Sequence, residues 1–212
     1  MSEELGKIEK PSAEGFKKGR KLYFIPLIYS GAESPTEYLE KYNKYWNQVE
    51  NHISDLQLKL GSINKIYHEL IAVAGEEGSK VIGELNDKCY HVIKAILDKG
   101  AELEALEKAE LLTEFMDWSR CLAIGLQNQQ VFTKVYESYT EAGKKRNEYI
   151  VSQIDETLKE DETGMLLMRE GSQVQFPPDI QVFYVAPPAL DEIKRWFRDR
   201  EAKSQKDELS DN

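Results

Sequence analysis

The sequence predicts an α/β fold, in which a small and mainly parallel sheet lies between helices and carries a large helical insertion. Three observations predict it. Four short apolar runs have the composition of strands, connections of helical length separate them, and nearly a hundred residues with a helical pattern lie between the second run and the third. Strands joined by such connections run mostly parallel, with right-handed crossovers.

The four strand candidates are rich in branched and aromatic residues. They are residues 21–30, KLYFIPLIYS; 63–71, INKIYHELI; 164–170, GMLLMRE; and 180–186, IQVFYVA. Their apolarity is continuous rather than alternating, which predicts strands that are covered on both faces. Pro26 indicates an edge, a bulge or a bend in the first run. The second run could also begin a helix.

The first helix is predicted to start at Ser34-Pro35-Thr36-Glu37, with Ser34 as its cap and Glu37 completing a capping box. Its apolar face consists of Tyr38, Tyr42, Tyr45, Val49, Ile53, Leu56 and Leu60, and Gly61 ends it. Leu39, Trp46 and Leu58 lie off this face. Either the helix is sandwiched between the sheet and the helical insertion, or its second face meets another subunit. The size of the cluster favours a homodimer.

Four further helical patterns follow. The second helix carries Val81, Leu85, Cys89, Val92 and Ile96 and closes near Gly100. Residues 101–126 continue helically, with a break expected at 117–119. A long pattern runs from 129 to 160, and the final helix starts after Pro187-Pro188.

A chain of 212 residues is predicted to form one domain. We expect a mobile leader at 1–20, a single α/β domain at 21–202 and a disordered tail at 203–212, because both ends are polar and lack apolar periodicity.

Charge and composition limit the partners. The net charge of −10 repels phosphate backbones and anionic lipid, so we expect neither nucleic acid nor a membrane as a partner. No apolar run approaches the roughly 18–20 residues that cross a bilayer. Cys89 and Cys121 lie within helical patterns, which is typical of reduced core thiols. These features predict a cytoplasmic protein.

A candidate site follows from the parallel sheet, because ligands bind beyond the carboxyl ends of its strands. Glu69 and Glu170 are candidate catalytic residues at two of these ends. The candidate ligand-binding residues are Tyr29, Ser30, His68 and Arg169.

Arg146 is the third catalytic candidate, because it falls within the apolar stripe that runs from Tyr139 through Ala142 to Ile150. A cation directed inward needs an anionic partner, for which we expect Glu69 or Glu170, or a bound ligand. The alternatives are a structural ion pair and a long side chain whose charged head reaches water.

No metal and no cofactor is expected. His68-Glu69 has the composition of a base with its partner or of two metal ligands, but the other two histidines, His52 and His91, lie on helical patterns without obvious convergence. The signatures of phosphate loops, dinucleotide folds and nucleophile elbows are missing from the sequence.

Three segments together resemble the TraB/ChaN/Tiki superfamily, which includes erythromycin esterase-like proteins. RKLYFIPLIYSG is similar to the first strand of the family, KKRNEYIVSQIDETL to its arginine-bearing helix, and TGMLLMREGSQV to the strand and loop that follow. The resemblance implies an α/β fold, with hydrolytic, metal-dependent or haem-binding activity in different branches. It also implies that Arg146 matches the helix arginine and Glu69 a family glutamate.

The chain departs from the pattern of this family at two histidine positions. Tyr29 stands where the first strand would end on histidine, and residues 171–174 are Gly-Ser-Gln-Val. We therefore expect an intracellular binding or interaction protein for an unknown small-molecule ligand, as a non-catalytic relative. The alternative is a hydrolase-like enzyme with its site at the carboxyl ends of the strands.

Overall fold

A five-stranded parallel sheet forms the centre of the molecule. The computed structural model describes residues 18–210, and the side chains of residues 18–204. The strands are β1 (Arg20–Pro26), β2 (Lys65–His68), β3 (Glu102–Leu103), β4 (Thr163–Met168) and β5 (Ile180–Tyr184), in the spatial order β3-β2-β4-β1-β5. Every pairing is parallel, so the predicted fold class is confirmed. The sequence did not predict β3, which has only two residues.

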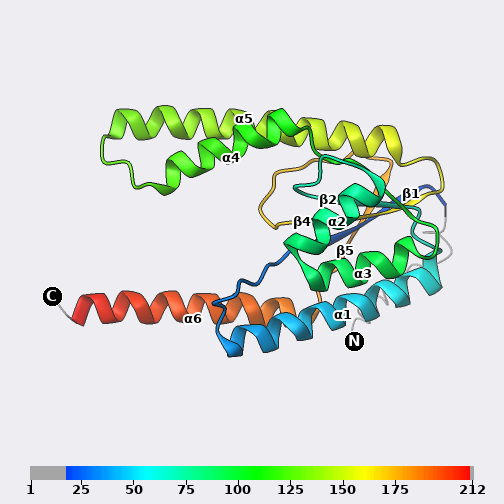
Figure 1. Cartoon of the computed structure of the whole chain (residues 1–212), viewed down its shortest axis with the longest axis horizontal. Coiled ribbons are helices and arrows are strands. Elements are labelled where there is room, and N and C mark those ends of the chain that lie inside the picture. The colour runs from blue at the N-terminus through cyan, green and yellow to red at the C-terminus, as the bar shows by residue number, and fades with distance from the viewer. Residues whose placement is uncertain (1–17, 211–212) are drawn as a thin grey trace, which may run out of the picture.

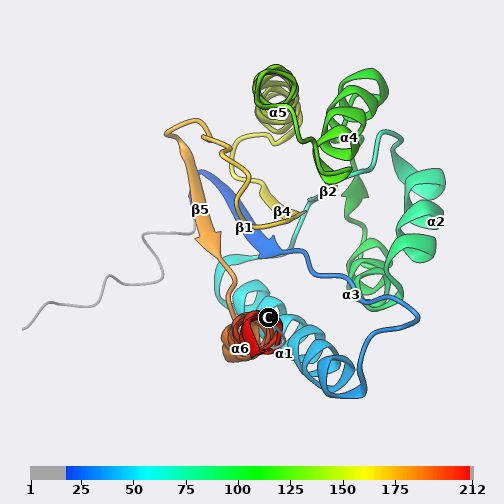
Figure 2. The same cartoon turned by 90° about the vertical axis from the view of Figure 1, so that its left-hand side faces the viewer.

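Helices cover both faces of the sheet (Figures 1 and 2). They are α1 (Thr36–Leu60), α2 (Gly75–Leu85), α3 (Asp87–Leu97), α4 (Ala109–Ala123), α5 (Gln129–Thr157) and α6 (Pro188–Ser210). One face of the sheet forms a core with α1, α3 and the start of α6. The opposite face forms a second core with Ile150 and Ile154 of α5 and with Leu158, the C-cap residue of this helix.

The central strand β4 is buried on both faces, as its continuous apolar run predicts. Met165 and Leu167 belong to the core beneath α1, whereas Leu166 and Met168 belong to the core beneath α5. Gly164 lies where neighbouring side chains leave little room at the start of the strand. A Cβ atom there would lie 2.9 Å from Leu22 Cδ1 and 3.0 Å from the ring of Tyr67.

The aromatic residues of α1 are buried within the chain. Tyr38, Tyr42, Tyr45 and Trp46 are at most 5% exposed, and the Tyr38 ring packs against Trp196 of α6 at a centroid distance of 5.3 Å. The helix therefore buries its aromatic residues against the sheet and the neighbouring helices, and its opposite face is exposed to solvent. The predicted cap is wrong: Pro35 is the N-cap residue, and the Ser34 hydroxyl accepts a hydrogen bond from the Gly31 N–H instead.

Two predicted helical stretches differ from the structure. The apolar spacing from Val81 to Ile96 crosses a break, because Asn86 ends α2 and caps α3 by accepting a hydrogen bond from the Cys89 N–H. Residues 101–108 contain β3 rather than helix, and α4 is unbroken at 117–119.

The final helix extends to Ser210, so most of the segment expected to form a disordered tail is helical. Residues 1–17 of the predicted leader, and residues 211–212, lie outside the described residues. Within the described part of the chain, no helix is both long and apolar enough to cross a membrane.

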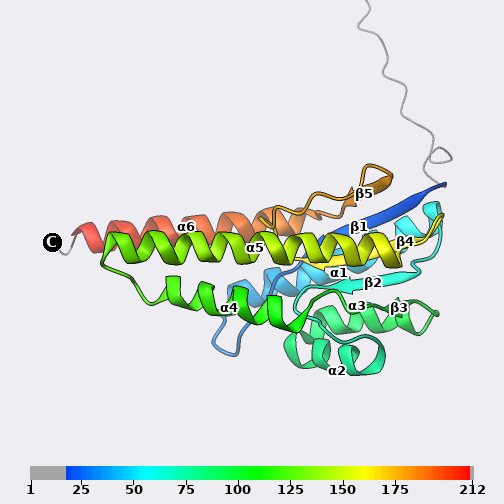
Figure 3. The ribbon, with the colours of Figure 1, turned by 90° about the horizontal axis from the view of Figure 1, so that it is seen from above.

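Two helical arms project past the carboxyl end of the sheet (Figures 1 and 3). One arm is the hairpin of α4 and the first half of α5, and the other is the end of α6. No residue of α4 is buried, and the buried residues of α5 begin at Ala142. The hairpin therefore packs on the sheet only through its second helix, and its inner surface remains open beside the strand ends.

Candidate functional site

A groove of about 1050 Å³ lies between the α4–α5 hairpin and the carboxyl end of the sheet. The strand ends contribute Glu69 after β2 and the loop that begins at Arg169 after β4. The hairpin contributes Phe115, Met116, Ser119, Arg120, Tyr136, Tyr139, Thr140, Gly143, Lys144, Arg146, Asn147, Glu148 and Val151. The groove thus lies where ligands bind in open parallel sheets.

A buried ion pair lies at the base of this groove. The Arg146 guanidinium donates from Nε to both carboxylate oxygens of Glu107, at 3.0 and 2.9 Å, and from Nη2 to Oε1. The two side chains are 4% and 0% exposed. Two charges withdrawn this far from water are stable only when they are paired and hydrogen-bonded, as they are here.

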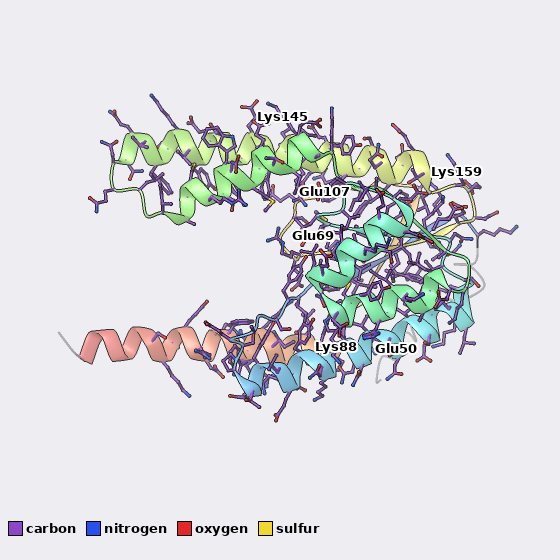
Figure 4. The ribbon with its side chains drawn as sticks, viewed as in Figure 1. Glu50, Glu69, Lys88, Glu107, Lys145 and Lys159 are labelled. Carbon is purple, nitrogen blue, oxygen red and sulfur yellow. The ribbon has the colours of Figure 1, made fainter. Side chains whose placement is uncertain are left out.

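Glu69 links this pair to the open part of the groove. Its carboxylate accepts a hydrogen bond from Arg169 Nε at 2.7 Å and lies 3.9 Å from Arg146 Nη2. The Glu69 side chain is 2% exposed, whereas that of Arg169 is 53% exposed. Burial raises the pKa of the Glu69 carboxyl, and the charges of Arg169 and Arg146 oppose this rise. Figure 4 shows Glu69 and Glu107 together near the end of the sheet, below the hairpin.

The turn after β2 is held by Glu107. Leu70 adopts a left-handed conformation with φ of 72°, which is unfavourable for a branched side chain. Its N–H donates to the Glu107 carboxylate at 3.2 Å, and the Glu107 N–H donates to the Ile71 carbonyl at 3.0 Å. Glu107 therefore fixes both the arginine and the backbone turn that presents Glu69.

The hairpin positions Arg146 from the opposite side. Its guanidinium carbon lies 5.0 Å from the centre of the Phe115 ring, which stacks on Tyr139 at a centroid distance of 5.0 Å. Phe115 approaches α5 closely at Gly143, where a Cβ atom would lie 3.3 Å from its ring. A cation over an aromatic ring is a stabilising arrangement, so α4 contributes to holding this arginine.

The prediction that Arg146 is buried against a carboxylate is confirmed, but its main partner is Glu107. The predicted partner Glu69 lies at the longer distance. Glu170 was wrong as a partner: it forms an ion pair with Lys194 at 2.6 Å and accepts from the Tyr184 hydroxyl. Glu170 still lines the groove.

The sequence interpretation missed Glu107, because its segment has neither helical nor strand periodicity. The only signal is an acidic residue directly after Leu106, which is buried in the core beneath α5.

Three of the predicted ligand-binding residues lie outside the lining of the groove. Ser30 is exposed to solvent. His68 is fully buried, its Nδ1 contacts the Glu69 carbonyl, and burial lowers its pKa to about 4, so the ring is neutral at pH 7. Among the described residues, His68 Nε2 and the Tyr29 hydroxyl have no hydrogen-bond partner. Burial, with a contribution from the charge of Glu69, raises the pKa of Tyr29.

Within residues 18–204, no cluster of three or more His, Cys, Asp or Glu side chains is arranged to hold a metal ion. Cys89 is buried, and both cysteines are free thiols. The charged groups at the base of the groove are two arginines and two buried carboxylates, which lie beside aromatic rings.

Comparisons with protein-family models, with curated protein sequences and with solved structures found no match to this chain.

Proposed function

We propose that this protein is an intracellular binding protein whose groove holds a small organic anion, with Arg169 as the anchoring residue. The single observation that carries the proposal is the half-exposed guanidinium of Arg169, fixed through its Nε to the buried carboxylate of Glu69. The proposal includes the TraB/ChaN/Tiki resemblance: the chain would be a non-catalytic relative of that superfamily. Arg146 and Glu69, the two residues that match the family, both lie at the groove.

The geometry of Arg169 suits anion binding. Its Nε donates a hydrogen bond to Glu69, and its terminal nitrogens have no hydrogen-bond partner among the described residues. A guanidinium presents several donors in a rigid fork that matches a carboxylate or a phosphate. Because Glu69 already orients this fork, little side-chain entropy remains to be lost when an anion binds.

The charge of the groove lining supports the same ligand class. Its side chains include the basic residues Arg120, Lys144, Arg146 and Arg169 and the acidic residues Glu69, Glu148 and Glu170, and the buried Glu107 beneath them balances the charge of Arg146. The whole chain carries a net charge of −10, so the groove is basic relative to the rest of the protein. Anions are therefore repelled less at this surface than over the rest of the chain.

Isothermal titration calorimetry tests the proposal with a panel of carboxylates and phosphates. We expect at least one to bind, and Arg169→Met to weaken that binding about 10- to 100-fold, which is the contribution of a charge-assisted hydrogen bond. Arg198→Met removes an exposed arginine outside the groove and should leave binding unchanged. If no anion binds, or if both variants behave alike, the proposal is wrong.

A hydrolase-like enzyme is the second candidate, and the burial of Glu69 favours it. A carboxylate at the base of a groove, whose pKa is raised by burial, is a candidate general base. The measurement is turnover of a panel of ester and phosphoester substrates, with Glu69→Gln as the variant. Turnover that Glu69→Gln abolishes would favour the enzyme, whereas no turnover on the panel would favour binding alone.

The homodimer stays a prediction. The apolar cluster of α1, which favoured a dimer, does not support it, because the aromatic residues of this helix pack inside the chain. Leu58 is the large apolar residue that α1 leaves 86% exposed. Light scattering of the native protein and of Leu58→Glu tests the dimer through this helix. Trp46→Glu is unsuitable as a probe, because it would place a charge in the core.

A further inference from the structure

We infer that the ligand is amphiphilic, with an anionic head at Arg169 and an apolar tail along the inner surface of the α4–α5 hairpin. This inference rests on the proposed function and adds the chemistry of the rest of the ligand. It depends on how polar and apolar side chains are distributed along the groove.

The groove follows one face of α5. Tyr136, Thr140, Gly143, Asn147 and Val151 recur every three or four residues and all line it. Arg146 lies near the sheet, and Tyr136 lies ten residues earlier on the same helix. At a rise of 1.5 Å per residue, these positions are separated by about 15 Å along the helix axis. The groove is therefore elongated.

Its two ends differ in chemistry. At the strand ends lie the buried charges of Glu69 and Arg146 and the open guanidinium of Arg169. Toward the tip of the hairpin the lining includes exposed apolar and aromatic side chains, since Tyr136 is 53% exposed and Met116 is 37% exposed, beside the polar Ser119, Arg120 and Thr140. A ligand with one charged end and one apolar end can place its tail on Tyr136 and Met116, whereas a ligand without an apolar part would leave these two side chains uncovered.

The size of the groove favours a small molecule over a protein segment. Small-molecule sites span roughly 300–1000 Å³, and this groove of about 1050 Å³ lies just above that range. A docked peptide helix would also require an apolar surface along its whole length, but Arg169 and Glu69 interrupt the surface at the strand ends. An elongated organic anion can contact Arg169 at one end of the groove and Tyr136 at the other.

Calorimetry with sodium acetate, octanoate and dodecanoate, each below its micellar concentration, tests the inference. We expect affinity to rise about fourfold for each methylene that is buried, and to level off once the tail reaches Tyr136. Tyr136→Ser should weaken dodecanoate binding about tenfold and leave acetate binding unchanged. Val131→Ser is the matched control, since Val131 lies on the same helix, is 46% exposed and does not line the groove.

The outcomes separate the two proposals. Equal affinity for acetate and dodecanoate, both weakened by Arg169→Met, would overturn the apolar tail and keep the anion site. Dodecanoate binding that survives Arg169→Met would overturn the anionic head. Equal effects of Tyr136→Ser and Val131→Ser would place the tail outside the groove and overturn the inference. If none of the three carboxylates binds, the inference of an amphiphilic ligand is wrong. The proposed anion site is then tested by the broader panel of carboxylates and phosphates.

Discussion

The two ends of the sheet each hold an arginine between carboxylates, but in opposite environments. At the amino end, Arg20 pairs with Asp155 at 2.7 Å and with Asp179 at 2.6 Å, and both acids are at least 50% exposed. At the carboxyl end, Arg146 pairs with Glu107 and lies 3.9 Å from Glu69, and both acids are at most 2% exposed.

The exposed cluster of Arg20, Asp155 and Asp179 at the amino end has a structural role. Arg20 also donates to the backbone carbonyl of Asp155 at 3.0 Å, so it ties the end of α5 to β1 and to the loop before β5. The buried cluster joins segments as well, but withdrawing its charges from water is costly, and apolar residues of similar size would hold the segments with less penalty. Because Arg146 and Glu69 line the groove, the proposed anion site gives these buried charges a role that apolar residues could not fill.

The largest effect is expected for Glu107→Leu. This change leaves Arg146 buried without its bidentate partner and leaves the Leu70 N–H without an acceptor. The free energy of unfolding should fall by about 3–5 kcal/mol in urea denaturation. The double variant Glu107→Leu, Arg146→Leu should recover part of the loss, because it removes the unpaired charge. A loss below about 1 kcal/mol for the single variant would show that the cluster is hydrated.

The second effect is a pH dependence caused by His68. Its pKa is about 4 in the folded chain against 6.5 ordinarily, so the unfolded chain binds more protons between these values. Stability should therefore fall as pH drops from 6.5 to 4, by about 3 kcal/mol.

Urea denaturation of the native protein and of His68→Leu across pH 4–7 measures this contribution as a difference. Glu69 acts in the opposite direction, because its raised folded pKa makes stability fall as pH rises above its ordinary value of 4.5. That contribution is common to both proteins and cancels in the difference. Parallel pH profiles for the two proteins would contradict the assignment to His68.

A smaller effect is expected for Arg169→Met. The arginine head is half exposed, but its partner Glu69 is buried, so we expect a loss of about 1–2 kcal/mol at pH 7. The loss should shrink toward pH 4, where a protonated Glu69 no longer needs a cation. Thermal denaturation at both pH values checks this, and a loss that grows in acid would be inconsistent with the pair.

The smallest effect is expected at the amino end. Asp179→Asn removes an exposed partner of Arg20, while Asp155 and the backbone acceptors remain, so the cost should be below about 1 kcal/mol and should vanish in high salt. Urea denaturation at low and high salt measures it. A cost as large as that of Glu107→Leu would remove the distinction between the two ends.

Patterns that repeat along the chain were predictable, and pairings that depend on tertiary structure were not. The apolar runs gave four of the five strands, and Arg146 was identified because it interrupts a helical stripe. Glu107 was missed because nothing local links it to an arginine 39 residues later. The break at Asn86 was hidden by apolar spacing that continues across it, although asparagine is itself a frequent N-cap residue.

The candidate site was predicted in part for the same reason. Glu69, Arg169 and Glu170 line the groove because parallel strands end at one edge. His68 and Tyr29 lie near this edge too, but their side chains are turned into the protein, and a pattern that is apolar on both faces does not reveal which way a polar side chain points.

The order of the strands has a consequence for how the chain folds during synthesis. β1 and β2 are made early, yet neither pairs with the other, and both pair with β4, which is made about a hundred residues after β2. The sheet therefore cannot close while the first three helices emerge from the ribosome, and their apolar faces remain uncovered during that interval. Apolar surface that stays uncovered while a chain is synthesised favours aggregation, so this strand order makes the nascent chain depend on late pairing with β4.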